Sequence, residues 1–379
     1  MLKTKTYVGL DSLPAQYSGL FAEASESSFF LSLPWFRNFE RSVLDSNEFT
    51  QIIGVETLEP SSLPVGALVL KASRCSRRLL RQLTVDSLTN YYSSYFAPIL
   101  ARRRDSNEIV TMLARELHYR RAQWDVLNLR PVDLSSAIVK RFYAALTELG
   151  FRTQTYFCFG NWYLNVSGRS YAEYFNDLPS VIRKNIPYYR RRLEKIARFK
   201  IAVYKSTEDV KPAIHDYETI YNSSWRKPEG NPNFVRGLIH TAAEQKWLRL
   251  GVCYVGDEPA AAQLWIVHRG IASIYKICYA EKFAKYSIGS VLTAHMLEQV
   301  LDIDRVVEVD YLTGDDSYKA SWMSARRERW GIIAFNPKSI WGKVGIVRHI
   351  GGKNLKSTWD RLYNSFVDSN KLLWTKDSK

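Results

Sequence analysis

Hydrophobic and polar residues recur along the chain at two spacings, which predict strands and helices in turn. Short apolar or alternating runs bounded by turn residues predict strands, and apolar residues three and four apart predict amphipathic helices. The expected strands are 51–56, 64–71, 124–129, 153–159, 161–166, 199–204, 247–254, 258–268, 271–279 and 306–311. The expected helices fill most of 15–50 and then 107–119, 135–149, 171–198, 210–224, 233–246 and 289–300. From about Arg326 the chain is basic and aromatic without a clear period.

The order of these elements predicts an α/β fold with two similar halves. Each half runs through helices, an antiparallel run, a helix and a further strand, which favours two mixed, mostly antiparallel sheets flanked by helices. We expect domains at 1–150 and 151–339, followed by a basic extension at 340–379. Local signals mark some element ends: Ser32 is a predicted N-cap with Pro34 in the first turn, and Gly150 closes a helix.

The features that bear most on function lie between Val252 and Trp322. A glycine turn, Tyr286-Ser-Ile-Gly-Ser290, stands where a strand leads into a helix. Backbone N–H groups at a helix start have no partner within the helix and can bind a phosphate. We therefore predict a cofactor-binding loop with Ser287 as the helix cap; the alternative is an ordinary capped junction. Its residues are Tyr286, Ser287, Ile288, Gly289 and Ser290.

A polar cluster follows the next strand. Asp310 ends that strand, where a carboxylate can accept the proton of an attacking amine or hydroxyl, so Asp310 is the predicted general base. It could equally form an ion pair with Lys319 or with an arginine of the basic helix. Lys319, with Tyr318, is predicted to bind a donor phosphate or to stabilise an oxyanion. Asp315 and Asp316 either bind the acceptor or form an Asx turn and a helix cap.

A dense basic segment occupies the expected helix 171–198. Arg183, Lys184 and Arg190 are predicted to bind an anionic acceptor, because an arginine can hold such a group through two hydrogen bonds. A solvated helix face is the alternative, and the same cluster would also suit a tRNA backbone or lipid headgroups. Trp225 either stacks on a sugar or carrier, or packs in the core at a helix end.

Composition limits the remaining function classes. The chain has 53 Lys and Arg against 38 Asp and Glu, a formal net charge of +15, which favours anionic partners. No nucleic-acid-binding motif accompanies this charge, so DNA is not expected. The cysteines Cys75, Cys158, Cys253 and Cys278 are scattered without metal-ligand spacing, and the last two lie in apolar strand patterns that predict core positions. Without a signal-like segment or a run of ~18 apolar residues, we expect a cytoplasmic protein with no metal.

These motifs together resemble the acetyltransferase domain of CelD/BcsL-type proteins, within the wider GNAT and FemAB superfamily. The resemblance is carried by Phe29-Phe-Leu-Ser-Leu-Pro-Trp35, the basic Val181–Glu194, Gly256–Trp265, Ile274–Ser290 and Asp310–Trp322. It implies two tandem GNAT-like domains and acyl transfer from acyl-CoA, with acetyl-CoA as the expected donor. It also implies that the acceptor is an amine or hydroxyl of a sugar or other cell-envelope or exopolysaccharide precursor, attacking the thioester directly.

The phosphate loop leaves the donor open. Familiar GNAT enzymes carry Arg/Gln-x-x-Gly-x-Gly/Ala there, whereas Lys285-Tyr-Ser-Ile-Gly-Ser290 keeps one glycine, as in the FemAB branch. One alternative is therefore a FemAB-like transferase that uses aminoacyl-tRNA. Another is a non-catalytic scaffold of a polysaccharide-synthesis complex. Peripheral contact with an anionic membrane through the basic residues is a further expectation.

Overall fold

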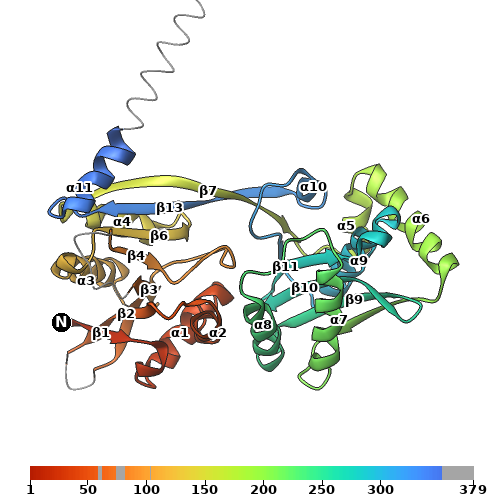
Figure 1. The fold of residues 1–379 in the computed structure, drawn as a ribbon, viewed down its shortest axis with the longest axis horizontal. Helices are drawn as coiled ribbons and strands as arrows, with labels where there is room; N and C mark the ends of the chain where they lie inside the picture. Colours follow the sequence, from red (N-terminus) through yellow and green to blue (C-terminus); the bar gives the residue numbers. More distant parts are fainter. Residues whose placement is uncertain (59–61, 74–81, 103, 352–379) are drawn as a thin grey trace, which may run out of the picture.

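A single mixed β-sheet runs through the whole molecule (Figure 1). The computed structural model describes residues 1–58, 62–73, 82–102 and 104–351. Its thirteen strands follow the order β1-β2-β3-β4-β6-β13-β7-β12-β11-β10-β9-β8, with β5 against β3. Their bounds are β1 (Leu2–Val8), β2 (Glu48–Thr57), β3 (Pro64–Ser73), β4 (Thr84–Ser87), β5 (Ile99–Leu100), β6 (Val126–Val132), β7 (Arg152–Asn165), β8 (Phe199–Tyr204), β9 (Leu248–Val255), β10 (Glu258–His268), β11 (Ile271–Tyr279), β12 (Glu308–Asp310) and β13 (Ala325–Phe335).

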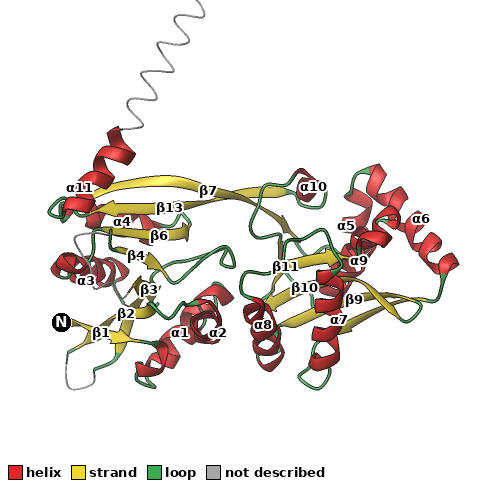
Figure 2. Ribbon diagram, in the orientation of Figure 1, coloured by secondary structure: helices red, strands yellow, loops and turns green. Residues whose placement is uncertain are grey.

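Helices cover the strands of both halves (Figure 2). They are α1 (Tyr17–Ser25), α2 (Leu33–Val43), α3 (Ser106–Tyr119), α4 (Ala137–Glu148), α5 (Tyr171–Asp177), α6 (Ser180–Ile196), α7 (Val210–Asn222), α8 (Pro232–Glu244), α9 (Ile288–Glu298), α10 (Ser317–Ala320) and α11 (Ile340–Ile346). Shorter helical turns are η1 (Leu10–Ser12), η2 (Phe29–Leu31), η3 (Arg121–Gln123), η4 (Glu281–Tyr286), η5 (Gln299–Ile303) and η6 (Val347–Gly351). The predicted α/β fold with two helix-flanked halves is thus confirmed.

Strands β7 and β13 connect the two halves of the sheet. β7 pairs with β13 along most of its length, and its last residues, Tyr163–Asn165, pair with β12 of the second half. β13 follows the second half in sequence but lies between β6 and β7. The prediction of two strands at 153–159 and 161–166 is therefore wrong, and so is the expectation of no regular structure after Arg326. Both segments become regular because they pair with each other, although they lie far apart in the sequence. A β-bulge opposite Arg329–Trp330 takes up the shift in register between the two strands.

The basic helix expected over 171–198 is two helices. Ser170 caps α5 in a capping box with Glu173. Pro179 then stands at the N-cap of α6 with an extended ψ of 139°, and Leu178 before it is extended as well. Proline disfavours a helical conformation in the residue before it, so the helix stops and restarts there.

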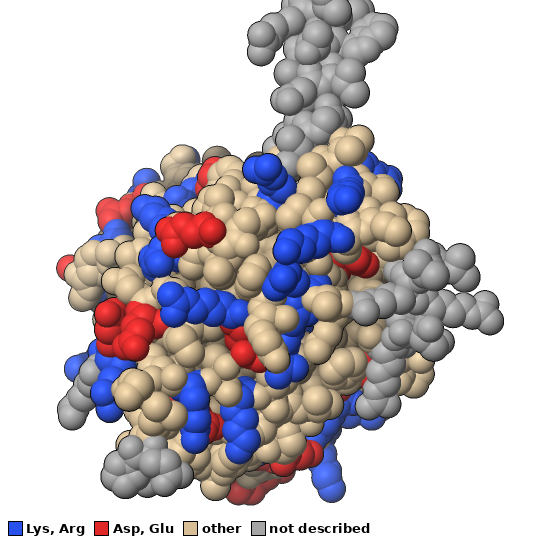
Figure 3. All heavy atoms as spheres, turned by 90° about the vertical axis from the view of Figure 1, so that its left-hand side faces the viewer, with Lys and Arg blue, Asp and Glu red and all other residues tan. Residues whose placement is uncertain are grey.

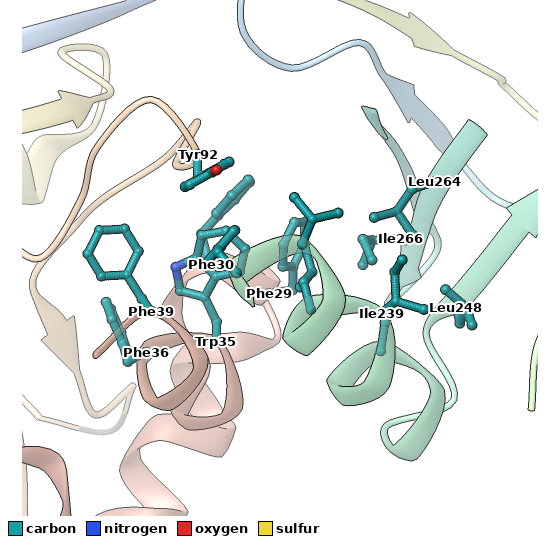
Figure 4. Packing of buried hydrophobic residues seen from close by; sticks show 14 of the residues in the cluster. Phe29, Phe30, Trp35, Phe36, Phe39, Tyr92, Ile239, Leu248, Leu264 and Ile266 are labelled. Atoms are coloured by element: carbon teal, nitrogen blue, oxygen red, sulfur yellow. The ribbon is translucent and has the colours of Figure 1, made fainter. Parts of the chain in front are cut away.

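An aromatic core joins the first half to the second. η2 and α2 supply Phe29, Phe30 and Trp35, which face α8 and β10 across the boundary (Figure 4). The Trp35 ring lies 4.7 Å from that of Phe30 and 5.4 Å from that of Phe234, both edge-on. The predicted N-cap at Ser32 is confirmed, since its hydroxyl accepts from the Trp35 N–H at 3.2 Å. Separate cores lie under α3 and α4 in the first half and under α6 and α9 in the second.

The C-terminal extension expected at 340–379 begins with α11 and η6, and residues 352–379 lie outside the described part of the chain. The domain limits at 150 and 339 stay predictions, with β7 and β13 crossing between the halves they separate. Cys75 is likewise outside the described residues, while Cys253 and Cys278 are buried as predicted. No helix within the described ranges is long and apolar enough to cross a membrane.

Candidate active site

A cleft of ≈ 200 Å³ lies between the two halves and is lined by three segments and by Arg226. The first half contributes the loop 91–94, and the second contributes 274–277 of β11 and the loop and short helix 311–319. Two predicted catalytic residues and one predicted acceptor residue line it: Lys319, Tyr318 and Asp316. Arg226 and Lys276 add positive charge. We define this cleft as the candidate active site.

Strands β11 and β12 separate where they reach the cleft. They pair in parallel over Ile271–Ser273, after which the chain beyond Asp310 turns away while β11 continues to Tyr279. Among the described strands, β11 beyond Ser273 pairs only with β10, so its other edge is free. On this edge the Ile277 carbonyl accepts a hydrogen bond from Arg226 Nε at 2.7 Å. A free strand edge offers backbone groups to an extended chain that carries amides.

Lys319 is buried and organises the turn beside the cleft. Its Nζ donates to the carbonyl of Thr313 at 2.6 Å and lies 3.4 Å from Asp316 Oδ2. Burial lowers the pKa of Lys319, and the neighbouring Asp316 opposes that shift. Gly314 has φ +110°, and a Cβ there would lie 3.1 Å from both Lys319 Nζ and Asp316 Oδ2. The turn therefore requires glycine to bring the ammonium and the carboxylate together.

Tyr318 and Asp316 are the accessible polar groups of this turn. Burial raises the pKa of Tyr318 to about 12, so its phenol is protonated at neutral pH and can donate a proton. The Asp316 side chain is 60% exposed. Asp316 occupies the N-cap position of α10, but its side chain makes no capping hydrogen bond. The helix-cap alternative is thus wrong for its side chain, which pairs with Lys319 instead.

Asp310, the predicted base, is held by three partners. Its Oδ1 accepts from Asn161 Nδ2 at 2.5 Å and from the Leu312 N–H at 2.7 Å, and its Oδ2 from Arg327 at 2.5 Å. The arginine of the predicted ion-pair alternative therefore comes from β13 rather than from the basic helix. Asp310 lines an adjoining cavity instead of the cleft. These contacts engage both carboxylate oxygens and hold Asp310 outside the cleft lining, so the geometry does not favour the base role, which stays a prediction.

The predicted cofactor loop stands at the start of α9. Ser287 occupies the predicted N-cap position of α9, but its backbone is left-handed with φ 47° and its side chain makes no capping hydrogen bond. The Ser290 N–H donates to the Ser287 carbonyl at 2.9 Å. The N–H groups of Ile288 and Gly289 begin the helix, where α9 itself offers no acceptor. Tyr286 ends η4 with its ring 5.2 Å from the Arg192 guanidinium carbon.

A chain of contacts connects this loop to the cleft. A Cβ at Gly289 would lie 3.1 Å from the Tyr279 ring, whose centroid lies 4.2 Å from that of Trp225 with the rings tilted by 39°. Arg226, a lining residue of the cleft, lies 5.2 Å from the Trp225 ring. Trp225 is 46% exposed, so the core alternative for this residue is wrong.

A buried hydrogen-bond network fixes α9 to the sheet. Gln263 Nε2 donates to the Gly289 carbonyl at 2.9 Å and to Thr293 Oγ1 at 2.8 Å. The indole N–H of Trp265 donates to Gln263 Oε1 at 2.9 Å and holds the amide in place. The sequence contains both residues in Gly256–Trp265, but only the hydrogen bonds show that they position the loop.

Four of the predicted acceptor residues lie elsewhere. Arg183, Lys184 and Arg190 are exposed on α6, at the far end of the second half in Figure 1, and none of them lines the cleft. Asp315 accepts from Arg326 at 2.7 Å and from the Trp162 indole at 2.9 Å, outside the cleft lining. The Arg326 hydrogen bond keeps the pKa of Asp315 below its ordinary value. The structure thus brings Asp316, Tyr318 and Lys319 together but leaves these four apart.

The sequence did not point to a second buried ion pair at the cleft. Glu229 pairs with Lys276 and also accepts from the Tyr92 hydroxyl at 2.6 Å, which ties the first half to the second. Burial lowers the pKa of Lys276, while Glu229 opposes that shift. Glu229 and Tyr92 are 137 residues apart, and neither sits in a motif, so no sequence signal could have paired them.

The distribution of charge and of possible metal ligands bears on which groups could take part in the reaction. On the face at the left of Figure 1, Lys and Arg side chains are spread out and interleaved with acidic ones, so positive charge there is dispersed (Figure 3). Within the described residues, no group of three or more His, Cys, Asp and Glu side chains is placed to hold a metal ion. The polar side chains that line the cleft carry amines, a guanidinium, a carboxylate, phenols and the hydroxyls of Ser94 and Thr313.

Comparison with known proteins agrees with this fold. Residues 180–320 match a family model described as an acetyltransferase (GNAT) domain. FemX is 8% identical with a TM-score of 0.58, covering 88% of this chain and 96% of that chain. A tandem GNAT protein from the clavulanic acid biosynthesis pathway is 13% identical with a TM-score of 0.51, covering 89% and 100%.

A conserved protein of unknown function from Bacteroides thetaiotaomicron is 10% identical with a TM-score of 0.53, covering 89% of this chain and 100% of that chain. No curated protein matches the sequence. These likenesses extend over nearly the whole chain, whereas the family model covers part of the second half. The chain therefore shares the fold of the tandem GNAT protein and of FemX, and residues 180–320 are similar to an acetyltransferase (GNAT) domain.

Proposed function

We propose that this protein transfers an acyl group from acyl-CoA to an amine or hydroxyl bound in the cleft. One observation carries this proposal: the free edge of β11 extends between the start of α9 and the Lys319 turn. From Ile274 to Tyr279 that edge is about 17 Å long at the usual strand rise. CoA has a phosphate end, an extended arm with two amides and a terminal thiol, which suits this sequence of groups. Acetyl-CoA is the donor that we expect.

The donor phosphates would lie at the first turn of α9. The N–H groups of Ile288 and Gly289 and the positive end of the helix dipole favour an anion there. Arg192 and Lys285 each have their charge 5.2 Å from the Tyr286 ring, at the same loop. The amide arm would follow the β11 edge, and the thioester would reach the cleft between the two halves.

The chemistry is a direct attack on the thioester. The acceptor lone pair forms a bond to the carbonyl carbon while the carbon–sulfur bond breaks. Asp316 is the exposed carboxylate of the cleft and accepts the acceptor's proton. Asp310 suits this role less well, because its carboxylate is bound by Arg327. Tyr318 donates a proton to the departing thiolate, and the positive charge of Lys319 stabilises the developing oxyanion. The resemblance to CelD/BcsL-type proteins suggests a sugar or cell-envelope precursor as acceptor.

Replacing Gly289 by tryptophan is expected to weaken CoA binding at least 100-fold, measured by isothermal titration calorimetry. Even a Cβ there approaches Tyr279 at 3.1 Å, so a large side chain must cover the first turn of α9. Gly19→Trp is the matched control, because Gly19 is an exposed helix residue with nothing within 4 Å of a built Cβ. Equal CoA affinity in both variants would contradict the donor site.

The same titrations separate the rival functions. Micromolar binding of CoA and acetyl-CoA supports acyl transfer from CoA. Absence of CoA binding, together with tight and salt-sensitive binding of aminoacyl-tRNA, would favour the FemAB-like alternative. Binding of neither donor would favour a scaffold that has kept the fold.

A further inference from the structure

A second cavity of ≈ 200 Å³ adjoins the cleft and belongs to neither the donor path nor the Lys319 turn. It is lined by the start of η2 and residues 94–95 of the first half, by 308–312 of the second, and by β13. Leu312 and Ser94 line both spaces, and Ser94 shares a 2.7 Å hydrogen bond with Thr313 of the cleft. The two spaces are therefore neighbours across a thin wall.

Arg329 of β13 is the unusual residue of this cavity. It is 7% exposed, yet its Nε and Nη1 have no hydrogen-bond partner among the described residues. Asp133 Oδ2 lies 3.3 Å from Nη1, within ion-pair distance but without hydrogen-bond geometry. Arg327, two residues earlier on the same strand, is instead fully engaged with Glu308 and Asp310. A buried guanidinium with free donors is costly unless something else accepts from it.

The charged side chains that line the second cavity indicate which kind of group could accept hydrogen bonds from Arg329. A guanidinium alone would favour a carboxylate or phosphate. Here four carboxylates line the same cavity against two arginines, so an added negative charge would be repelled. The carboxylates are those of Glu26, Asp133, Glu308 and Asp310. Burial lowers the pKa of His268, which leaves it uncharged at neutral pH and adds no positive charge. Neutral groups that both donate and accept hydrogen bonds suit this mixture of carboxylate and guanidinium.

We propose that this cavity binds one neutral, hydroxyl-rich ring, of the size and chemistry of a single sugar unit. Its hydroxyls accept from Arg329 and donate to Asp133, while Phe29, Phe30 and Tyr95 supply apolar walls. Since the cavity adjoins the cleft, the ring is part of the acyl acceptor; only this assignment rests on the proposed function. The binding of the ring itself does not.

The test is saturation-transfer NMR and calorimetry on the full chain with glucose, N-acetylglucosamine, glucuronate, acetate and inorganic phosphate. We expect a neutral sugar to bind and the three anions to bind at least tenfold more weakly. Arg329→Met should weaken sugar binding about tenfold or more, because hydrogen bonds to a charged group are lost. Its unfolding temperature is measured alongside, because removal of the cation leaves Asp133 without its charged neighbour and can lower stability without any role in binding.

Two further variants keep the test decisive. Asp133→Asn should weaken sugar binding several-fold; a gain in anion binding with no loss of sugar binding would overturn the proposal. Arg141→Met, on the outside of α4 and paired with Glu148, is the matched control and should leave binding unchanged. If Arg329→Met does not fold, Asp133→Asn decides. CoA binding without any sugar binding would overturn this inference alone, whereas sugar binding without CoA binding would leave it standing and remove the proposed donor.

Discussion

An alanine at position 35 is expected to lower the free energy of unfolding by about 4 kcal/mol. Trp35 is 1% exposed and packs edge-on against Phe30 of the first half and Phe234 of the second. Its removal leaves a cavity at the boundary between the halves, where the surrounding rings are fixed by their own packing. Urea unfolding followed by circular dichroism measures the effect.

Trp225→Ala is the matched control for this prediction. Trp225 is 46% exposed and packs against Tyr279, so its loss should cost less than about 1 kcal/mol. Similar midpoints for Trp35→Ala and the wild-type protein would contradict a shared core. A Trp35→Ala protein that unfolds in two separate transitions would show that this core also couples the two halves.

Asparagine at position 316 is expected to lower kcat about 100-fold or more, with CoA affinity unchanged. The exposed Asp316 carboxylate is our proposed proton acceptor in the cleft, and asparagine keeps its shape while removing its basicity. Steady-state kinetics with acetyl-CoA and an acceptor, together with CoA titration, separates the chemical step from donor binding.

Asp310→Asn is expected to have the opposite effect, a loss of stability with little loss of kcat. Because Asp310 is paired with Arg327, we expect this variant to lose about 2 kcal/mol of stability and to keep most of the kcat of its folded fraction. If Asp310→Asn abolishes turnover while Asp316→Asn does not, Asp310 is the base and our assignment of Asp316 is wrong. Lower kcat in both variants would indicate that the Asp310 pair positions the turn that carries Asp316.

Local sequence patterns were sufficient to predict many helices and strands, but not which strands pair with each other. The predicted strands 199–204, 258–268 and 271–279 coincide with β8, β10 and β11 to the residue, because each is a largely apolar run of strand-forming residues. Strand β13 was not predicted, because its first half contains four consecutive charged residues, Arg326–Arg329, which are typical of a basic tail. Its structure depends on pairing with β7, from which it is separated by more than a hundred residues. Periodicity within a segment contains no information about such a partner.

The candidate active site shows the same difference between what local sequence patterns predict and what long-range contacts decide. The order of hairpin, third strand, glycine turn, helix and polar cluster was readable from the sequence, and it located the loop at Gly289 and the turn with Asp316, Tyr318 and Lys319. Which polar group is free to react was not readable, because that depends on neighbours distant in sequence. Arg327 engages Asp310, Arg326 engages Asp315, and Lys276 is matched by Glu229.

Local sequence patterns were enough to predict the helix-flanked halves, the start of α2 at Ser32 and the end of α4 at Gly150, where φ is +88°. These follow from side-chain period, capping and backbone sterics, which act over a few residues. Only the tertiary structure decided that β13 crosses to the first half, that the halves share an aromatic core, and that Arg329 is buried with free donors. Those features arise from contacts between segments that the chain brings together only on folding, where burial fixes whether a charged group is paired or free.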